Sequence, residues 1–283
     1  MRFLEPETLN EALDALMADP DGTKVIAGGT ALVLMMRNGL IAPPTLLSLG
    51  RVPDLDVIRQ EGDTLIIGAM TPLREVANSP LARQHFPALA DACGMVGNAR
   101  VRNQATLGGN LAEADYASDP PAVLLALGAC VNVVDSVGGR SVDIADLITG
   151  FYATTLDPRE LITTITIPIP PPNTRMAYLK YKSRSSEDRP CVGVAAVATF
   201  DGEACADLRV AVGAACEIPR RLHSVEQMAK GQPLTDSLIA EIAEGYAAGI
   251  DTLEDMRGST WYRQQMIRAH ARRALEEVRD GRR

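Results

Sequence analysis

The stretch 101–119 limits what this chain can fold into more than any other part of the sequence. It reads VRNQATLGGNLAEADYASD, a polar run rich in small residues with apolar segments on both sides. The glycine pair Gly108–Gly109 removes two Cβ atoms, so main-chain N–H groups can approach a bulky anion, and Thr106 and Asn110 add short donors. The stretch therefore predicts a turn that can hold a phosphate-bearing ligand, with a plain tight turn as the alternative.

A second glycine pair, Gly28–Gly29, lies between a predicted strand at 24–27 and a predicted helix at 31–38. Such a unit aims free N–H groups at the turn, where a pyrophosphate can lie against the positive end of the helix. Neither pair matches G-x-G-x-x-G or G-x-x-x-x-G-K-[ST], so neither a nicotinamide Rossmann site nor a P-loop is predicted. Each pair alone is most simply a turn, but the two together favour two walls of one extended cofactor site.

Composition excludes several classes of protein. A formal net charge of −8 argues against nucleic acid or an anionic membrane as the main partner. The five cysteines show no C-x-x-C spacing, which indicates neither a zinc nor an iron–sulfur site, and their odd number argues against a secreted disulfide framework. No window approaches the roughly 18 apolar residues of a membrane span. We therefore expect a cytoplasmic protein.

The predicted elements divide the chain into three parts and favour an α+β fold. The boundaries fall near 51–54 and at the proline cluster Pro168–Pro172, which gives parts 1–53, 54–170 and 171–283. The first begins with a capping box, Thr8 to Glu11, and the second with a predicted hairpin of strands 56–59 and 64–68. The third has strands predicted at 176–182, 192–200 and 208–214, an antiparallel sheet, with helices after them.

Two charged groups suggest function, and each has a simpler interpretation. Asp115 and Asp119 could form an acid/base pair, but no histidine is near them in sequence, and loop carboxylates are the better interpretation. The C-terminal helix carries five arginines, which predict a solvated face. The alternative is a basic surface that docks an acidic patch of a partner. The arginines are Arg263, Arg268, Arg272, Arg273 and Arg279.

Over nearly its whole length the sequence resembles the FAD-binding medium subunit of molybdenum hydroxylases. This family includes the flavoprotein subunits of aerobic carbon monoxide dehydrogenase and of bacterial xanthine dehydrogenases. The residues that carry the resemblance are Ala27-Gly-Gly-Thr-Ala-Leu32, the run from Arg100 to Ala112, Ser118-Asp119, Glu160, Ile167-Pro168, Tyr178-Leu-Lys-Tyr181 and Trp261-Tyr-Arg263.

The resemblance implies a two-lobed FAD-binding domain of the vanillyl-alcohol-oxidase (PCMH) type, formed by 1–53 and 54–170. A smaller α+β domain with a three-stranded antiparallel sheet and helices would follow at 171–283. The pyrophosphate would be held mostly by backbone N–H groups of Ala27, Gly28, Gly29, Thr30, Ala31, Thr106, Gly108, Gly109 and Asn110. Relatives often carry a polar side chain where this chain has Ala31, so only backbone contacts are expected there.

The resemblance also places residues near the flavin itself. Asp119 would accept a hydrogen bond from the sugar-like chain or the ring edge, and Ile162 and Lys180 would line the isoalloxazine. A lysine there could stabilise negative charge at the pyrimidine end of the ring. From the sequence alone, Lys180 could equally be a solvated strand residue. Neither a catalytic nor a metal-binding residue is implied in this chain.

The function implied is electron transfer. A large partner subunit would carry a molybdopterin that oxidises the substrate, and a small partner subunit would carry [2Fe–2S] clusters that pass electrons to the FAD of this chain. The complex would be a dimer of heterotrimers. Two alternatives stay open at this point: a stand-alone flavin-dependent reductase of the same fold, and a structural subunit that has lost its flavin.

Overall fold

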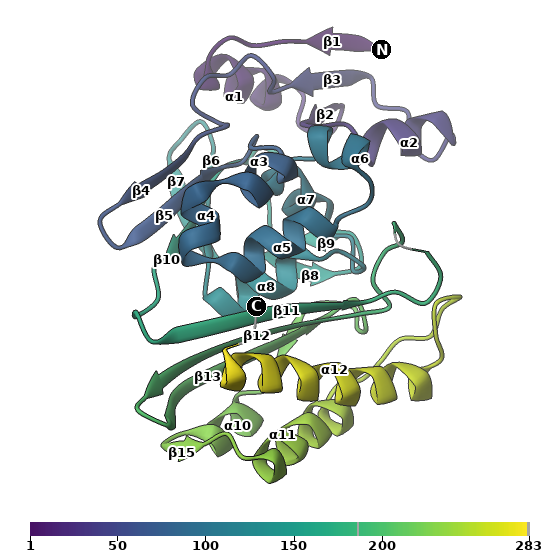
Figure 1. Cartoon of the computed structure of the whole chain (residues 1–283). Coiled ribbons are helices and arrows are strands. Elements are labelled where there is room, and N and C mark those ends of the chain that lie inside the picture. The colour runs from purple at the N-terminus through teal and green to yellow at the C-terminus, as the bar shows by residue number, and fades with distance from the viewer. Residues whose placement is uncertain (186, 282–283) are drawn as a thin grey trace.

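The structure is a computed structural model that describes residues 1–185 and 187–281. Three main β-sheets lie one below another, with helices packed around and between them (Figure 1). Within the described residues, no helix is both long enough and apolar enough to cross a membrane. The predicted α+β class is confirmed.

The first sheet is parallel and contains, in spatial order, β1 (Arg2–Leu4), β3 (Thr45–Ser48) and β2 (Thr23–Ile26). Parallel strands need crossover connections, here made through α1 (Leu9–Ala18) and α2 (Leu32–Arg37). Thr8 caps α1 as predicted, because its Oγ1 accepts a hydrogen bond from the Glu11 amide at 3.2 Å. The buried side of α1, which includes Leu13 and Leu16, packs with Leu47 in one apolar cluster.

The second sheet is antiparallel and contains, in spatial order, β4 (Ile58–Glu61), β5 (Thr64–Gly68), β10 (Leu161–Pro168), β6 (Cys130–Val134) and β7 (Gly139–Asp143). The predicted hairpin is present, but its first strand lies two residues later than expected, at Ile58–Glu61 rather than at 56–59. The reason is a tighter turn, in which Gly62 adopts a φ of 55° that favours glycine.

The third sheet is also antiparallel, and three long strands form its body: β11 (Thr174–Tyr181), β12 (Val192–Asp201) and β13 (Ala204–Gly213). These are the three strands that the sequence predicts. Two short strands pair with β13 and extend the sheet, β14 (Arg220–Arg221) and β15 (Gln232–Pro233). Strands of two residues have no alternation that a sequence pattern could reveal.

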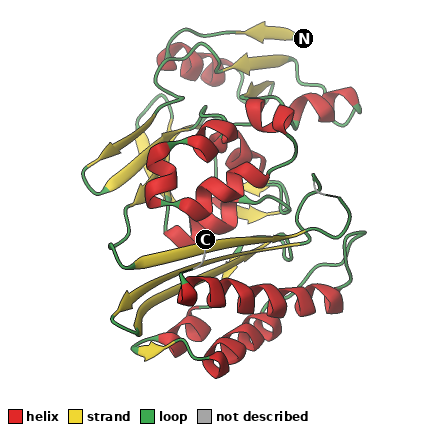
Figure 2. Cartoon of the chain, viewed as in Figure 1, coloured by secondary structure: helices red, strands yellow, loops and turns green. Residues whose placement is uncertain are grey.

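Helices cover both faces of the third sheet (Figure 2). One face packs against the last helices of the chain, α10 (His223–Glu226), η1 (Gln227–Ala229), α11 (Asp236–Gly249) and α12 (Thr260–Asp280). The other face packs against α5 and α8, which belong to a group between the second and third sheets. That group consists of α3 (Leu73–Asn78), α4 (Pro80–His85), α5 (Pro87–Met95), α6 (Ala99–Gln104), α7 (Leu107–Glu113) and α8 (Pro120–Leu127). All of α8 is buried because other elements cover it all round.

Three short elements complete the fold, α9 (Ile144–Leu147) and the small hairpin of β8 (Ile148–Gly150) and β9 (Ala153–Thr154). The third glycine pair of the sequence, Gly138–Gly139, lies where the chain turns from β6 into β7, as its hairpin interpretation predicts.

Arg263 departs from the solvated face predicted for the C-terminal helix. Its side chain is fully buried, and Nη1 donates to the carbonyls of Cys191 and Ala214, each at 2.6 Å. Nη2 forms an ion pair with Asp255 at 2.5 Å. A buried guanidinium is tolerated only when it is paired and hydrogen-bonded in this way. Arg272 and Arg273 are exposed as predicted, whereas Arg268 and Arg279 are half-buried.

Candidate functional site

A cavity of about 740 Å³ is lined by residues from all three main sheets. Ligand pockets typically have volumes of roughly 300–1,000 Å³. The lining comes mainly from 20–34, 96–119 and 154–162, and it also includes Leu49, Ala69, Met70, Lys180, Glu187 and Arg189. Every residue that the sequence analysis assigned to a cofactor lies on this lining.

One wall is the loop from β2 into α2, which includes Gly28, Gly29 and Ala31. Gly29 has a φ of 70°, a backbone conformation that residues with a Cβ atom rarely adopt. A Cβ on Gly28 would lie 1.8 Å from the carbonyl oxygen of Gln104. Glycine is therefore required at position 28 by the close approach of α6. At its beginning α2 has no side-chain cap at the Ala31 position, and the Val33 amide donates to the Gly29 carbonyl at 3.0 Å.

The second wall, 106–110, differs from the predicted turn. Leu107 begins helix α7, and Thr106 is its N-cap, with Oγ1 accepting a hydrogen bond from the Gly109 amide at 3.0 Å. A Cβ on Gly108 would lie 2.5 Å from the Cβ of Ala69, so this glycine also allows close packing within the protein. Asn110 and Ser118 hydrogen-bond to each other through their side chains. The sequence analysis predicted a turn because two glycines lower helix propensity, an effect that the N-cap and tertiary packing override.

The two glycine segments lie directly against each other. A Cβ on Gly109 would be 3.3 Å from the Cβ of Ala27, and Gly28 contacts the backbone at the end of α6. The sequence separation between the pairs is about 80 residues, yet they form adjacent walls of one cavity, as predicted.

A buried ion pair also belongs to the lining. Asp119 is 2% exposed, and its Oδ2 accepts from Lys180 Nζ at 2.8 Å while its Oδ1 accepts from the Tyr178 hydroxyl at 2.6 Å. Lys180 also donates to the Met95 carbonyl at 2.8 Å, and only 1% of its side chain is exposed. The alternative interpretation of Lys180 as a solvated strand residue is therefore wrong. Burial raises the pKa of Asp119, and Lys180 and Tyr178 act in the opposite direction.

Ile162 lines the cavity from β10, where the pairing of β10 with β6 shifts register between Ile162 and Thr164. The side chain is 7% exposed. A bulge of this kind changes which side chains point to one face of a sheet.

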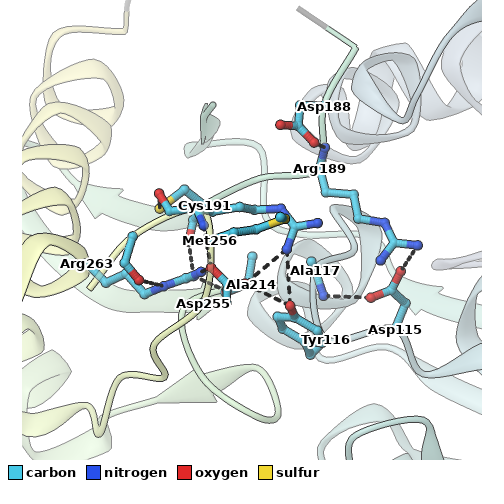
Figure 3. A network of polar contacts seen from close by, with 12 residues as sticks. Asp115, Tyr116, Ala117, Asp188, Arg189, Cys191, Ala214, Asp255, Met256 and Arg263 are labelled. Atoms are coloured by element: carbon cyan, nitrogen blue, oxygen red, sulfur yellow. Dashed lines mark hydrogen bonds and ion pairs between the residues drawn. The ribbon is translucent and has the colours of Figure 1, made fainter. Parts of the chain in front are cut away.

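The two carboxylates of the 101–119 stretch have separate partners. Asp115 forms an ion pair with Arg189 at 3.0 Å, and its Oδ1 accepts from the Ala117 amide at 3.1 Å (Figure 3). Asp119 instead pairs with Lys180. The two therefore do not share a proton, which agrees with their interpretation as non-catalytic carboxylates.

Beside Asp115, a polar network joins the cavity segment to the C-terminal part of the chain (Figure 3). The Tyr116 hydroxyl donates to Asp255 at 2.8 Å, and Asp255 also pairs with Arg257 and with the buried Arg263. Burial opposes ionisation of Asp255, but the Arg257 amide, Tyr116 and Arg263 together lower its pKa to about 2. The network therefore contains a carboxylate that stays ionised.

Sequence analysis missed several charged residues of the lining, among them Glu113 and Arg189. Burial raises the pKa of Glu113, and the neighbouring Asp115 adds to this shift. Arg189 reaches Asp115 over 74 positions of sequence, a proximity that no local pattern could have revealed.

Comparison with known proteins accounts for this architecture. Residues 1–170 match the family model described as the FAD binding domain in molybdopterin dehydrogenase, and residues 177–278 match the CO dehydrogenase flavoprotein C-terminal domain. The nicotine 6-hydroxylase medium subunit of Paenarthrobacter nicotinovorans is 33% identical over 98% of this chain and 97% of its own length. The glyceraldehyde dehydrogenase medium chain of Sulfolobus acidocaldarius is 30% identical, also over 98% of this chain and 97% of its own length.

A solved structure of carbon monoxide dehydrogenase from Hydrogenophaga pseudoflava superimposes with a TM-score of 0.95 at 30% identity, covering 98% of this chain and 96% of that one. The two matched domains, the relatives and the solved structure all indicate the same family. The chain therefore belongs to the family of FAD-binding medium subunits of molybdenum hydroxylases.

Proposed function

We propose that this chain is the electron-transferring flavin subunit of a molybdenum hydroxylase complex. It receives electrons from [2Fe–2S] clusters of a small partner subunit and passes them to an external acceptor, while a large partner subunit oxidises the substrate at a molybdopterin. The observation that carries the proposal is that both glycine segments and the Lys180–Asp119 pair line a single cavity. When bound, FAD supplies the ability to accept and release electrons, which the side chains lack.

The residues of the first wall fit the pyrophosphate of FAD. The loop 27–31 lines the cavity, and α2 begins there without a side-chain cap. In the second wall, Thr106 accepts from Gly109 and keeps its own hydroxyl hydrogen as a donor. Gly108, Gly109 and Asn110 complete this wall. Their amides donate within the protein, to the Ala69 carbonyl, to Thr106 Oγ1 and to the Thr106 carbonyl, so the donor that we assign to this wall is the Thr106 hydroxyl.

The residues at the other end fit the isoalloxazine ring. Ile162 offers an apolar surface. An ammonium group has three donors, and Lys180 uses two of them for Met95 and Asp119, which leaves the third for a ring oxygen. Its positive charge favours the electron-rich state of the pyrimidine end. We assign Lys180 and Asp119 to the flavin and assign no residue of this chain to substrate chemistry.

The names of the relatives support a subunit rather than a stand-alone reductase. They are called medium chains or medium subunits, and this chain spans 97% of the length of two of them. We infer the large molybdopterin partner, the small [2Fe–2S] partner and the dimer of heterotrimers from this kinship. We place the complex in the cytoplasm; the five cysteines of this chain are free thiols.

The proposal is tested by native purification of the complex, followed by identification of the co-eluting subunits, metals and flavin. We expect molybdenum, iron and FAD, with the FAD on this chain after the subunits are separated. A complex that shows no flavin spectrum, even after FAD is added, would refute the proposal. A lone polypeptide that oxidises NADPH would support the stand-alone reductase instead.

A further inference from the structure

Tyr178 is not part of the cavity lining, but its hydroxyl hydrogen-bonds Asp119, which is. It precedes Lys180 by two positions on β11, so the two side chains point to the same face of the sheet. The side chain is 5% exposed, and its hydroxyl donates to Asp119 Oδ1 at 2.6 Å. Asp119 thus receives Tyr178 on one oxygen and Lys180 on the other.

The neighbouring strand leaves space for this phenol. Gly193 on β12 lies opposite Lys180 in the strand pairing, and a Cβ there would lie 2.5 Å from the Tyr178 hydroxyl oxygen. Any larger residue at 193 would displace the hydroxyl from Asp119. The close fit of the phenol against Gly193 therefore holds the Tyr178 hydroxyl at Asp119.

We propose that Tyr178 is a positioning residue of the flavin site, whose hydroxyl keeps Asp119 ionised and aligned on Lys180 and so sets the net charge next to the flavin. This inference rests on the proposed binding of FAD in the cavity. With Asp119 ionised, the Lys180 charge is compensated. With Asp119 protonated, the ammonium is uncompensated and the flavin becomes easier to reduce.

The groups that face Asp119 come from two elements and the segment after β11. Tyr178 and Lys180 lie on β11, Lys182 follows that strand and favours the carboxylate, and the buried thiol of Cys93 lies on α5. Burial raises the pKa of Asp119, while Lys180 and then Tyr178 lower it. A hydrogen bond to the charged form of a carboxyl favours ionisation.

The test measures the flavin reduction potential of the FAD-loaded full chain against pH, over the whole range in which the chain stays folded. Where Asp119 takes up a proton this profile bends, and the potential is higher on the acidic side of the bend. Tyr178→Phe should move the bend upward by about one to two pH units, the equivalent of one hydrogen bond to a charged group. Asp119→Asn should abolish the bend, and Tyr178→Phe should have no further effect in that background.

Tyr246→Phe is the matched control, because it also removes a buried hydroxyl, one bonded to the Val210 carbonyl at 2.7 Å and to Glu226 at 3.1 Å. It should lower the melting temperature and leave the bend in place. The inference is overturned if Tyr178→Phe leaves the profile of the wild type unchanged, or if the bend persists in Asp119→Asn. Absence of bound FAD in the wild-type chain would instead refute the proposed function.

Discussion

At the scale of single residues, the glycines of the two segments have different physical roles. The sequence analysis argued that glycine pairs leave room for an anion. Gly28 and Gly108 instead make room for other parts of the protein, the Gln104 carbonyl and Ala69. Gly29 is needed for its positive φ. The glycines line the cavity, but sequence analysis did not foresee these close contacts within the protein, because the space around a missing Cβ depends on segments distant in sequence.

Gly28→Ala should destabilise the chain and reduce its retention of FAD. The new Cβ would meet the Gln104 carbonyl at 1.8 Å, so α6 or the 27–31 loop must move. Overpacking typically costs about 1–3 kcal/mol. Gly138→Ala is the control, since a Cβ there has nothing within 4 Å. Urea denaturation and flavin absorbance measure the two effects, and equal behaviour of the two variants would contradict the prediction.

Lys180→Met should be more harmful at neutral than at acidic pH. It leaves Asp119 buried without its cation, and breaking a buried pair typically costs about 3–5 kcal/mol. Burial raises the pKa of Asp119 in the folded state above its unfolded value, so stability is greatest at low pH and falls as the pH rises through the folded pKa. Without Lys180 this fall should be steeper. The pH dependence of stability is measured as the denaturation midpoint at a series of pH values. The double variant Lys180→Met with Asp119→Asn should lose the fall that depends on Asp119.

At the scale of elements, the 101–119 stretch shows how tertiary structure overrides local propensity. Two helices, α6 and α7, occupy most of a segment that was predicted as a glycine turn. Asn98 caps α6 and Thr106 caps α7 through their side chains. Sequence analysis identified neither cap, because Gly108–Gly109 indicated a turn.

Thr106→Ala should shorten or destabilise α7 and weaken FAD binding together. Loss of an N-cap costs about 0.5–2 kcal/mol, and the Gly109 amide loses its acceptor. Thr235→Ala removes the corresponding cap of α11, where Thr235 accepts from the Leu238 amide at 3.2 Å. Both variants should lower the melting temperature, but only Thr106→Ala should raise the Kd for FAD, measured by fluorescence titration. Thr106→Ser should restore both properties.

At the scale of the whole molecule, the cavity belongs to no single sheet. Its lining includes β2 of the first sheet, β10 of the second and β11 of the third. The Tyr116–Asp255–Arg263 network ties the 101–119 stretch to α12 at the C-terminal end (Figure 3). A ligand in this cavity contacts elements that are brought together only in the folded chain.

FAD should therefore stabilise the entire chain in one transition. A ligand that binds only the folded state adds about 2.7 kcal/mol at a concentration of 100 times its Kd. Thermal unfolding of the flavin-free chain, followed by circular dichroism, should shift upward with added FAD. FMN, which lacks the adenosine phosphate half, should shift it less, because it cannot reach all the walls. An unchanged transition with saturating FAD would count against the cavity as its site.

The sequence by itself determined the fold class, the main strands of the third sheet and part of the cavity lining, the two glycine segments above all, because local pattern and recognisable motifs specify these. Only the tertiary structure decided that Lys180 is buried with Asp119 and Tyr178, that Arg263 is enclosed by Cys191, Ala214 and Asp255, and that Arg189 reaches the cavity. Each of these depends on which distant segments meet. The burial and pairing of a charge are set by its neighbours in space, and no single stretch of sequence contains those neighbours.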